Sequence, residues 1–373
     1  MEPRLAEKRA ATELESMRHR HSDYMLWART EGRARFNLAT SGVGSFPLHE
    51  LPVTIDRLEI NGDSTYGYAP LQHALAKKCG VDPDCVVAAA GTSMANHLAM
   101  ATLIDPGDEV LIEQPTYELL PSTLLYLGAE VKHFARTEES GYALDPAQVR
   151  RVITRKTKLI VLTNLHNPSS ALASETALRE VGGLARSVGA RTLVDEVYLD
   201  AVYVKTPKPS YHLGPEFVVT SSLTKVYGLS GLRCGWILAE PELARAMWRL
   251  NDLFASIPAH PAELLSVVAL ENLDYIRERT RKIVEADRAL LREFLARHEA
   301  VTTPRTESGT TAILRLPSGS VDDFLTRLRV EYETSAVPGR FFGLPNHFRI
   351  GMGVDTEMFR EGLQRIGQAL KTG

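Results

Sequence analysis

The sequence predicts an α/β fold in which helices sandwich a mostly parallel seven-stranded sheet, with a smaller α+β domain beside it. Between about residues 85 and 240, short apolar runs alternate with helical patterns, and such runs are typical of strands covered on both faces. After residue 240 the pattern becomes helical and then mixes strands with helices. We therefore expect an N-terminal arm that contributes to the small domain (1–50), a large domain (51–245) and a small domain (246–373).

Seven apolar runs are the predicted strands of the large domain. Helical segments between them would form βαβ crossovers, so we expect mostly parallel neighbours whose carboxyl ends meet at one rim, where ligands bind in such sheets. The runs are CVVAAAG (85–91), DEVLIEQ (108–114), AEVKHFA (129–135), TKLIVLTN (157–164), ARTLVDE (190–196), EFVVTSS (216–222) and CGWILAE (234–240).

The remaining segments are predicted from apolar periodicity. A long helix is expected near 275–298, where apolar residues fall close to one face. Further on, TAILRLP (311–317) and HFRIGMG (347–353) are predicted strands, and the helices around them carry Phe324 and Leu363 on their apolar faces. The first forty residues are expected to be helical, packing on the small domain or on another subunit.

Composition and charge narrow the function. The 373 residues carry 43 Lys and Arg against 46 Asp and Glu, a formal charge of −3, so neither a nucleic-acid surface nor an anionic membrane is an expected partner. No segment approaches the roughly 18 apolar residues of a membrane span. The N-terminus lacks the apolar core of a signal peptide, and three cysteines show no metal-ligand spacing. We expect a cytoplasmic protein without a bound metal that acts on small molecules.

Polar residues follow several predicted strands at the rim. Gly91 ends the first strand, and Thr92 and Ser93 then open a helix whose free backbone N–H groups and positive dipole end suit a phosphate dianion. A simple N-cap is the alternative interpretation of these hydroxyls.

Five further residues have both a structural and a functional interpretation. Asp195 ends an apolar strand and needs a cationic partner, which is either a structural base or the protonated nitrogen of a bound heteroaromatic ring. Asn167, before Pro168, either forms a turn or contacts a ligand. Tyr117 either packs in the core or offers an aromatic face to a planar ligand, and Tyr198 either packs or donates a hydrogen bond into the same site as Asp195. Arg349, in an apolar strand, meets either an internal acid or a substrate carboxylate, for which its planar fork is suited.

Lys225 discriminates between these interpretations. It lies in SSLTKVYGLSGLRCGW, among small hydroxyl and apolar residues, with no charged neighbour within seven residues on either side. Desolvation lowers the pKa of a lysine, and a neutral amine can form a Schiff base. A phosphate cradle, an acid for a ring nitrogen and an Asn and a Tyr for a ring hydroxyl complete the requirements of pyridoxal 5'-phosphate.

With these motifs the sequence resembles the fold type I pyridoxal-phosphate enzymes of the class I/II aminotransferase family over nearly its whole length. The family's Ser-x-x-Lys motif, with an arginine eight positions after the lysine, is present as Ser222, Lys225 and Arg233. The resemblance implies that Ser222 and Arg233 join Gly91, Thr92 and Ser93 at the phosphate.

The other family motifs appear in the expected order. DEVY matches the family's aspartate-to-tyrosine spacing, which implies that Asp195 binds the pyridine nitrogen and that Tyr198, with Asn167, binds the 3-hydroxyl. By the same resemblance Tyr117 stacks on the ring. Arg349 matches the arginine that binds the substrate α-carboxylate.

Two loops and one departure from the family pattern complete the resemblance. SGVGSFP (41–47) is similar to the loop on the substrate side, which implies substrate contacts for Gly42 and Val43 and also for Asn167. NGDSTYGYAP (61–70) resembles the region whose tyrosine reaches a partner subunit's phosphate, through Tyr66 or Tyr68. Ser170 stands where the family usually has glycine. VPGRFFG (337–343) is a further candidate for lining the substrate site.

The implied activity is transamination, with Lys225, Asp195 and Tyr198 as catalytic residues. Lys225 would hold the aldehyde as a Schiff base and, once freed by an amino acid, move a proton from the substrate Cα to the cofactor. Asp195 would keep the ring nitrogen protonated. The products would be a 2-oxo acid and, after a second half-reaction, a new amino acid. A pyridoxal-phosphate lyase or synthase, by β- or γ-elimination or cyclisation, is the alternative on the same scaffold.

A non-enzymatic regulator with an aminotransferase-like sensor domain is the hypothesis from another class. It would need a DNA-binding module, and the roughly 80 residues before the first strand show no helix-turn-helix pattern or basic stripe. The resemblance further implies a homodimer with active sites at the interface.

Overall fold

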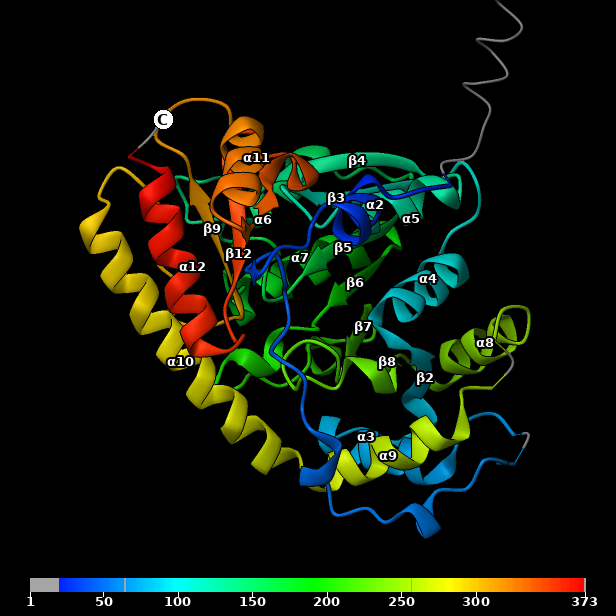
Figure 1. Cartoon of the computed structure of the whole chain (residues 1–373). Coiled ribbons are helices and arrows are strands. Elements are labelled where there is room, and N and C mark those ends of the chain that lie inside the picture. Colours follow the sequence, from blue (N-terminus) through cyan, green and yellow to red (C-terminus); the bar gives the residue numbers. More distant parts are fainter. Residues whose placement is uncertain (1–19, 64, 256, 372–373) are drawn as a thin grey trace, which may run out of the picture.

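The computed structural model describes residues 20–63, 65–255 and 257–371 (Figure 1). The predicted N-terminal arm therefore lies partly outside the described residues, which begin at Arg20. None of the helices in these ranges is long and apolar enough to cross a membrane.

The predicted seven-stranded sheet is confirmed, and each apolar run contains one of its strands. Six of the strands consist of buried or half-buried residues except for Ala90, at the end of β2, and Lys158, the second residue of β5, as expected for strands covered on both faces. The strands are β2 (Val86–Ala90), β3 (Glu109–Gln114), β4 (Glu130–Ala135), β5 (Thr157–Thr163), β6 (Arg191–Asp195), β7 (Phe217–Ser222) and β8 (Cys234–Leu238).

The strand order in this sheet is β2-β8-β7-β6-β5-β3-β4. The pairs among β7, β6, β5, β3 and β4 are parallel, whereas β8 is antiparallel to both of its neighbours, β2 and β7. Because β6 and β7 are parallel, their carboxyl ends lie together, and the β7–β8 connection that carries Lys225 begins at this rim. The topology thus brings the polar segments identified in the sequence to one edge.

Helices cover both faces of the sheet (Figure 1). Helix α4 packs on β7 and β8 and contacts α5 and α8, while α7 packs on β5 and β6 and contacts α6. Right-handed crossovers place these two groups on opposite faces. The helices are α3 (Ala69–Cys79), α4 (Gly91–Leu103), α5 (Leu119–Tyr126), α6 (Pro146–Val152), α7 (Glu175–Val188), α8 (Pro241–Asn251) and α9 (His260–Glu271).

The C-terminal part is a second α+β unit. Strand β12 (His347–Gly351) pairs antiparallel with β9 (Thr311–Arg315) and β11 (Val337–Pro338). The predicted long helix is α10 (Leu273–Arg297), and it runs beside α12 (Thr356–Ala369) in Figure 1. Helix α11 (Val321–Glu331) covers the same sheet.

The prediction of a helix through the first forty residues is wrong after residue 30. Helix α2 (Asp23–Thr30) begins at the N-cap Ser22, whose hydroxyl accepts a hydrogen bond from Met25 N, and Glu31 is its C-cap. The chain then forms β1 (Phe36–Asn37), which pairs parallel with β10 (Thr334–Ser335). This pairing satisfies backbone groups that a continued helix would have bonded internally, so tertiary context overrides local propensity.

Two buried apolar clusters underlie the two units. One gathers residues from the seven-stranded sheet and its helices and extends to Ile276 in α10. The other joins Leu38 to the interior of α10, α11, α12 and the small sheet. The domain limits at residues 50 and 245 stay a prediction.

Candidate active site

The helix start predicted to bind phosphate lies beside the start of β8. Helix α4 begins at Gly91 directly after β2, and Thr92 Oγ1 donates a 2.8 Å hydrogen bond to Ser222 Oγ at the end of β7. Arg233 Nη2 donates to Ala90 O at 3.1 Å, and a Cβ built on Gly91 would lie 2.3 Å from the same nitrogen. Only glycine, which also tolerates the φ of +78° found here, allows the guanidinium to approach this closely.

These groups form a cradle for a doubly charged anion. Ser93 is exposed at the same helix end, and Arg233 is exposed beside it, so N–H groups, hydroxyls and a guanidinium face one place. Ser222 Oγ also lies 2.7 Å from Thr224 Oγ1. The N-cap residue itself is Ala90, whose side chain cannot cap the helix, which leaves the first N–H groups of α4 available to a ligand.

Asp195 lies at the end of β6 and is 5% exposed. Asn96 Nδ2 donates a 2.8 Å hydrogen bond to its Oδ2, and Val197 N donates to its Oδ1 at 3.1 Å. Burial raises the pKa of Asp195 to about 6, while the hydrogen bond from Asn96 and the nearby Lys225 ammonium oppose the shift. A carboxylate in this position is stabilised by a cation bound next to it.

Lys225 lies in the β7–β8 connection, and its Nζ donates to Ser41 Oγ at 3.0 Å. Burial, with further repulsion from Arg349 and Arg233, lowers the pKa of Lys225 to about 8. A sizeable neutral fraction of the amine is therefore present near neutral pH, as a nucleophilic lysine requires. Asp195 acts in the opposite direction, so the two residues are electrostatically coupled.

The predicted substrate loop packs on the backbone of Lys225. Val43 N donates to Lys225 O at 2.8 Å, and a Cβ on Gly42 would lie 3.1 Å from that same oxygen. Ser41, which precedes them, was not identified from the sequence although it contacts Lys225 directly. Its hydroxyl also interacts with the buried Tyr198, and burial raises the pKa of Tyr198 to about 12.

Arg349 is fully buried in β12 and meets Asn167 rather than an acid. Its Nη1 donates to Asn167 Oδ1 at 2.9 Å and its Nη2 donates to Tyr24 Oη at 3.1 Å, while Nε has no hydrogen-bond partner within the described residues. The face of the guanidinium packs on the ring of Phe342, 4.9 Å from its centroid. A buried guanidinium without a carboxylate partner is suited to binding one from a ligand.

Aromatic side chains surround this arginine. The ring of Tyr117, half-buried after β3, lies edge-on to that of Tyr24 with centroids 5.5 Å apart, and the Phe341 ring is also edge-on to Tyr24 with centroids 5.6 Å apart. Of the proposed lining segment 337–343, Phe342 touches Arg349, whereas Arg340 pairs with Asp322 away from it. The sequence did not identify Tyr24.

Ser170 adopts the backbone conformation that the family's glycine would have. Its φ is +63°, in the left-handed region, and its hydroxyl donates to Thr311 O at 2.8 Å. Ser170 N donates to His166 O at 2.6 Å, so the turn that contains Asn167 is closed in spite of the substitution. The side chain therefore gains a partner in β9 that offsets part of the backbone cost.

The two candidate interface tyrosines contact their own chain. Tyr66 Oη donates to Asp252 Oδ2 at 2.8 Å, and the ring of Tyr68 lies edge-on to that of His260 with centroids 4.9 Å apart. These contacts do not separate the two candidates, so their assignment stays a prediction.

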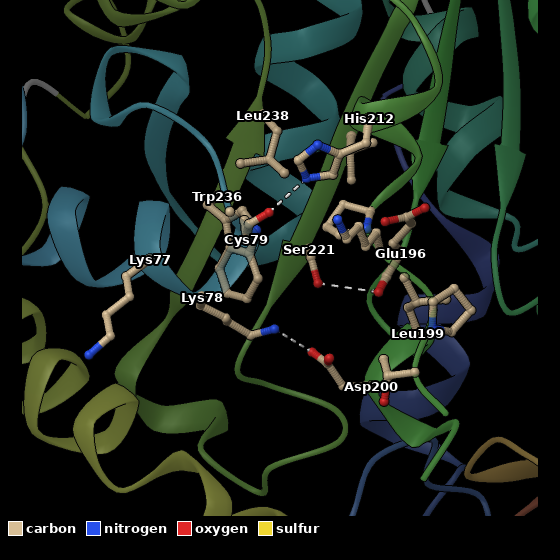
Figure 2. Close-up of a pocket in the computed structure, with 16 residues that line it drawn as sticks. Lys77, Lys78, Cys79, Glu196, Leu199, Asp200, His212, Ser221, Trp236 and Leu238 are labelled. Atoms are coloured by element: carbon tan, nitrogen blue, oxygen red, sulfur yellow. Dashed lines mark hydrogen bonds and ion pairs between the residues drawn. The ribbon is translucent and has the colours of Figure 1, made fainter. Parts of the chain in front are cut away.

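A separate cavity of about 370 Å³ lies on the other side of β6 (Figure 2). Lys78 and Asp200, which form a 2.9 Å ion pair, line it together with Trp236 and Glu196. Burial raises the pKa of Glu196 to about 8. Because successive residues of a strand point to opposite faces, Asp195 and Glu196 serve different sides of the sheet, and none of the predicted site residues lines this cavity.

The residues at the rim fit the cofactor expected from the sequence. An anion cradle tight enough to exclude a Cβ at Gly91, a buried carboxylate at Asp195 and a lysine of lowered pKa stand in the order that pyridoxal phosphate needs. Among the described residues no cluster of His, Cys, Asp and Glu could hold a metal ion.

Comparison with known proteins gives consistent matches. The family described as "Aminotransferase class I and II" matches residues 59–366. Capreomycidine synthase of Streptomyces vinaceus is 30% identical over 356 residues, covering 91% of each chain. The aspartate/prephenate aminotransferase of Thermus thermophilus is 26% identical over 323 residues, covering 82% of each. The crystal structure of a PLP-dependent aminotransferase of Streptococcus suis has a TM-score of 0.90 at 27% identity, covering 95% of this chain and 99% of that one.

Proposed function

This chain belongs to the family of class I and II aminotransferases, and we propose that Lys225, Asp195 and Arg349 are the residues through which it acts. It is a pyridoxal-phosphate-dependent aminotransferase, which exchanges an amino group between an amino acid and a 2-oxo acid. The observation that carries the residue assignment is the pairing of a lysine whose pKa is lowered to about 8 with a buried aspartate at the adjacent strand end.

The cradle residues hold the cofactor phosphate in this proposal. The N–H groups at the start of α4 and the hydroxyls of Thr92, Ser93 and Ser222 would bind its oxygens, and Arg233 would balance its charge. When bound, the cofactor supplies an electron-accepting ring. The Asp195 carboxylate would keep that ring's nitrogen protonated, which favours electron flow into it.

The orientation of the Asn167 amide follows from its neighbour. A guanidinium can only donate hydrogen bonds, so the oxygen of Asn167 faces Arg349 and its NH₂ group is free to donate. This NH₂ group, with the Tyr198 hydroxyl, would bind the 3-hydroxyl of the cofactor. Tyr117 would pack on the ring, and Gly42 and Val43 would border the substrate because they pack on Lys225.

Substrate orientation in this proposal depends on the Nε and Nη2 edge of Arg349. Nη1 is bound to Asn167 and Nη2 to Tyr24, while Nε has no hydrogen-bond partner among the described residues, so a substrate α-carboxylate would bind Nε and take the place of the Tyr24 hydroxyl at Nη2. With the carboxylate held there, the substrate Cα would come within reach of Lys225, whose neutral amine would take the Cα proton as a general base.

Two measurements on the holoenzyme test this assignment. Lys225→Ala should abolish turnover and retain the circular dichroism of the wild type, and wild-type turnover in that variant would refute the role of Lys225. A panel of single amino acids, given without any 2-oxo acid, should include one that yields one equivalent of 2-oxo acid per active site and bleaches the cofactor's visible band.

The synthase relative favours a second candidate activity. Capreomycidine synthase of Streptomyces vinaceus shares 30% identity over most of both chains, so a lyase or synthase reaction is the alternative to transamination for this chain. Such an enzyme would turn over repeatedly without an added 2-oxo acid. Continued release of ammonia, of pyruvate or of a cyclised product in the same panel would replace the aminotransferase assignment.

We further propose a homodimer in the cytoplasm. Leu253 and Phe254, after α8, are 79% and 50% exposed; the preceding Asp252 accepts a hydrogen bond from Tyr66, and the Phe254 ring lies edge-on to that of His97 in α4. Exposed apolar side chains that contact α4, the helix whose start forms the cradle, support an interface that completes the site. The three cysteines are free thiols, as expected in a reducing compartment. A monomer at micromolar concentration by light scattering would contradict the dimer.

A further inference from the structure

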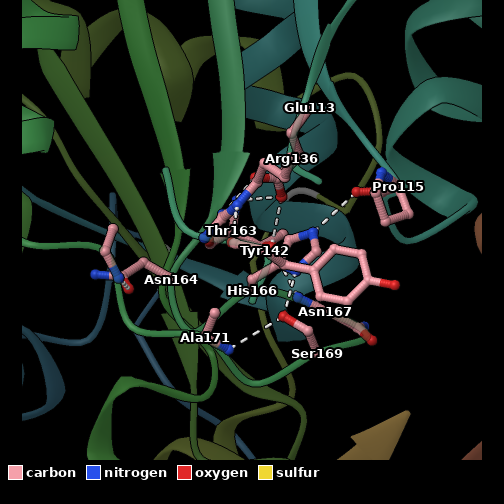
Figure 3. Close-up of polar contacts among 11 residues, drawn as sticks. Glu113, Pro115, Arg136, Tyr142, Thr163, Asn164, His166, Asn167, Ser169 and Ala171 are labelled. Carbon is pink, nitrogen blue, oxygen red and sulfur yellow. Dashed lines mark hydrogen bonds and ion pairs between the residues drawn. The ribbon is translucent and has the colours of Figure 1, made fainter. Parts of the chain in front are cut away.

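A buried polar chain leads from the edge of the sheet to Asn167 (Figure 3). Arg136, directly after β4, donates to Glu113 in β3 at 2.7 Å, and both side chains are fully buried. The Glu113 carboxylate accepts from the backbone N and the hydroxyl of Thr163, at 2.7 and 2.6 Å. Thr163 Oγ1 then accepts from Asn167 N at 3.0 Å. Three residues, Glu113, Thr163 and Asn167, thus join Arg136 to Arg349, because Asn167 accepts from Arg349.

The direction of each hydrogen bond in this chain is fixed by chemistry. Arg136 is a permanent cation and keeps Glu113 as an acceptor, although burial raises the pKa of Glu113. The Thr163 hydroxyl must therefore donate to Glu113, and its lone pairs are turned toward the Asn167 N–H. Because the Thr163 hydroxyl donates to Glu113 and accepts from Asn167 N, the direction of its O–H bond is fixed.

The rest of the Asn167 loop is anchored independently. Pro115 O can only accept, so His166 Nε2 donates to it at 2.9 Å, and Nδ1 accepts from Ser169 Oγ at 2.6 Å. These contacts fix the two ring nitrogens of His166, and neither involves the backbone N–H of Asn167. The Thr163 hydroxyl is the hydrogen-bond partner of that N–H.

We propose that Thr163 is a positioning residue for Asn167, and that the buried Arg136–Glu113 pair fixes the Thr163 hydroxyl in this role. The inference rests on the proposed contact between Asn167 and the cofactor hydroxyl. In this proposal Thr163 touches neither substrate nor cofactor. By holding the backbone N–H of Asn167, it determines the position and orientation of the Asn167 side chain in the site. Thr163 is also register-paired with Asp195, so the two cofactor contacts start from neighbouring strand ends.

The test uses the pH at which the visible absorbance band of the holoenzyme changes without substrate. Asn167→Ala should move this midpoint, because it removes a group at the cofactor hydroxyl. Thr163→Val keeps the shape but removes the hydroxyl, and we expect a movement in the same direction of about half a pH unit, the size of one modest hydrogen bond. Thr163→Ser, which keeps the hydroxyl, should have the wild-type midpoint.

Thr192→Val is the matched control, because Thr192 is a fully buried strand threonine whose hydroxyl has no hydrogen-bond partner in the described part of the chain. It should leave the midpoint unchanged. Should Thr163→Val not retain the cofactor, Thr163→Ala takes its place with the same expectation.

The outcomes separate this inference from the proposed function. If Asn167→Ala moves the midpoint and the hydroxyl-free Thr163 variants do not, Thr163 is not a positioning residue and the role of Asn167 stands. If Asn167→Ala leaves the midpoint unchanged, the proposed role of Asn167 fails. If the midpoint shifts as far in Thr163→Ser as in Thr163→Val, the inference fails as well. Thr163→Ser keeps the hydroxyl, so such a shift would result from altered packing.

Discussion

Arg349 Nη2 donates a 3.1 Å hydrogen bond to the hydroxyl of Tyr24, which joins a fully buried strand residue of the C-terminal unit to the first described helix, α2. The same guanidinium lies over the Tyr24 ring, 5.9 Å from its centroid. The N-terminal segment therefore covers the residue proposed to bind the substrate carboxylate, and it occupies one nitrogen of the fork that a carboxylate would need.

Tyr24→Phe should tighten the binding of carboxylate ligands. Without the hydroxyl, Nη2 is free, so a carboxylate need not displace a hydrogen bond worth about 1 kcal/mol. We expect the Kd of a 2-oxo acid, measured by spectral titration, to fall by about fivefold. Tyr126→Phe is the control, because Tyr126 lies at the C-terminal end of α5 and is 40% exposed. Weaker binding in Tyr24→Phe would show that the hydroxyl helps to bind the carboxylate.

Asn96→Leu should move the acidic limb of the kcat/KM profile to higher pH. Asn96 donates to Asp195 and thereby lowers its pKa, which burial has raised to about 6. Loss of that hydrogen bond raises the pKa further, so the ionised carboxylate is lost at a higher pH. We expect a shift of roughly one unit. Thr220→Val removes only the 2.6 Å donor to Asn96 Oδ1 and should shift the limb less. If the acidic limb stays at the same pH in both variants, it does not report the ionisation of Asp195.

Lys225 should react with small aldehydes at lower pH than an exposed lysine does. Its pKa is lowered to about 8, so its neutral fraction rises about tenfold per pH unit below 8 and levels off above that value. Reductive methylation of the cofactor-free protein, followed by peptide mass spectrometry, gives the rate at each pH. Lys282, whose side chain is 71% exposed, is the internal reference. A Lys225 rate that still rises steeply at pH 10 would contradict the lowered pKa.

Ser170→Ala should destabilise the protein more than Ser170→Gly. Both variants lose the hydrogen bond to Thr311, but only glycine also relieves the cost of a φ of +63°. We expect a loss of about 1–2 kcal/mol in the free energy of unfolding for alanine and a change within about 1 kcal/mol for glycine. Urea unfolding at one fixed cofactor concentration measures both. Equal losses would mean that the left-handed backbone contributes no strain here.

Much of the fold could be predicted because strands covered on both faces are continuous apolar runs. β5 and β7 are buried over nearly all their residues, and their boundaries lie within one or two residues of the predicted ones. The helix expected through residues 31–40 could not be corrected from sequence, because β1 exists only through its pairing with β10, nearly 300 residues away along the chain.

The site was predictable where a side chain follows a strand end directly. Asp195 and Lys225 have that position, and the structure brings them together with the start of α4. Asn96 could have been found, because it lies one helical turn after Thr92 and so shares its face. The contact of Ser41, the first residue of the predicted loop 41–47, with Lys225 and that of Tyr24 with Arg349 could not, since long-range packing alone makes them.

The place of β8 between β2 and β7 has a consequence for the order of assembly. Within the seven-stranded sheet β2 is bonded to β8 alone, so the helix that carries Thr92 has no fixed place beside Ser222 until β8 has inserted. During synthesis the chain must therefore reach residue 238 before the anion cradle can exist. Until then, the edges of β2 and β7 that pair with β8 have unpaired backbone hydrogen-bonding groups. A fragment that ends before β8 would contain the lysine and most of the sheet and still be unable to retain the phosphate.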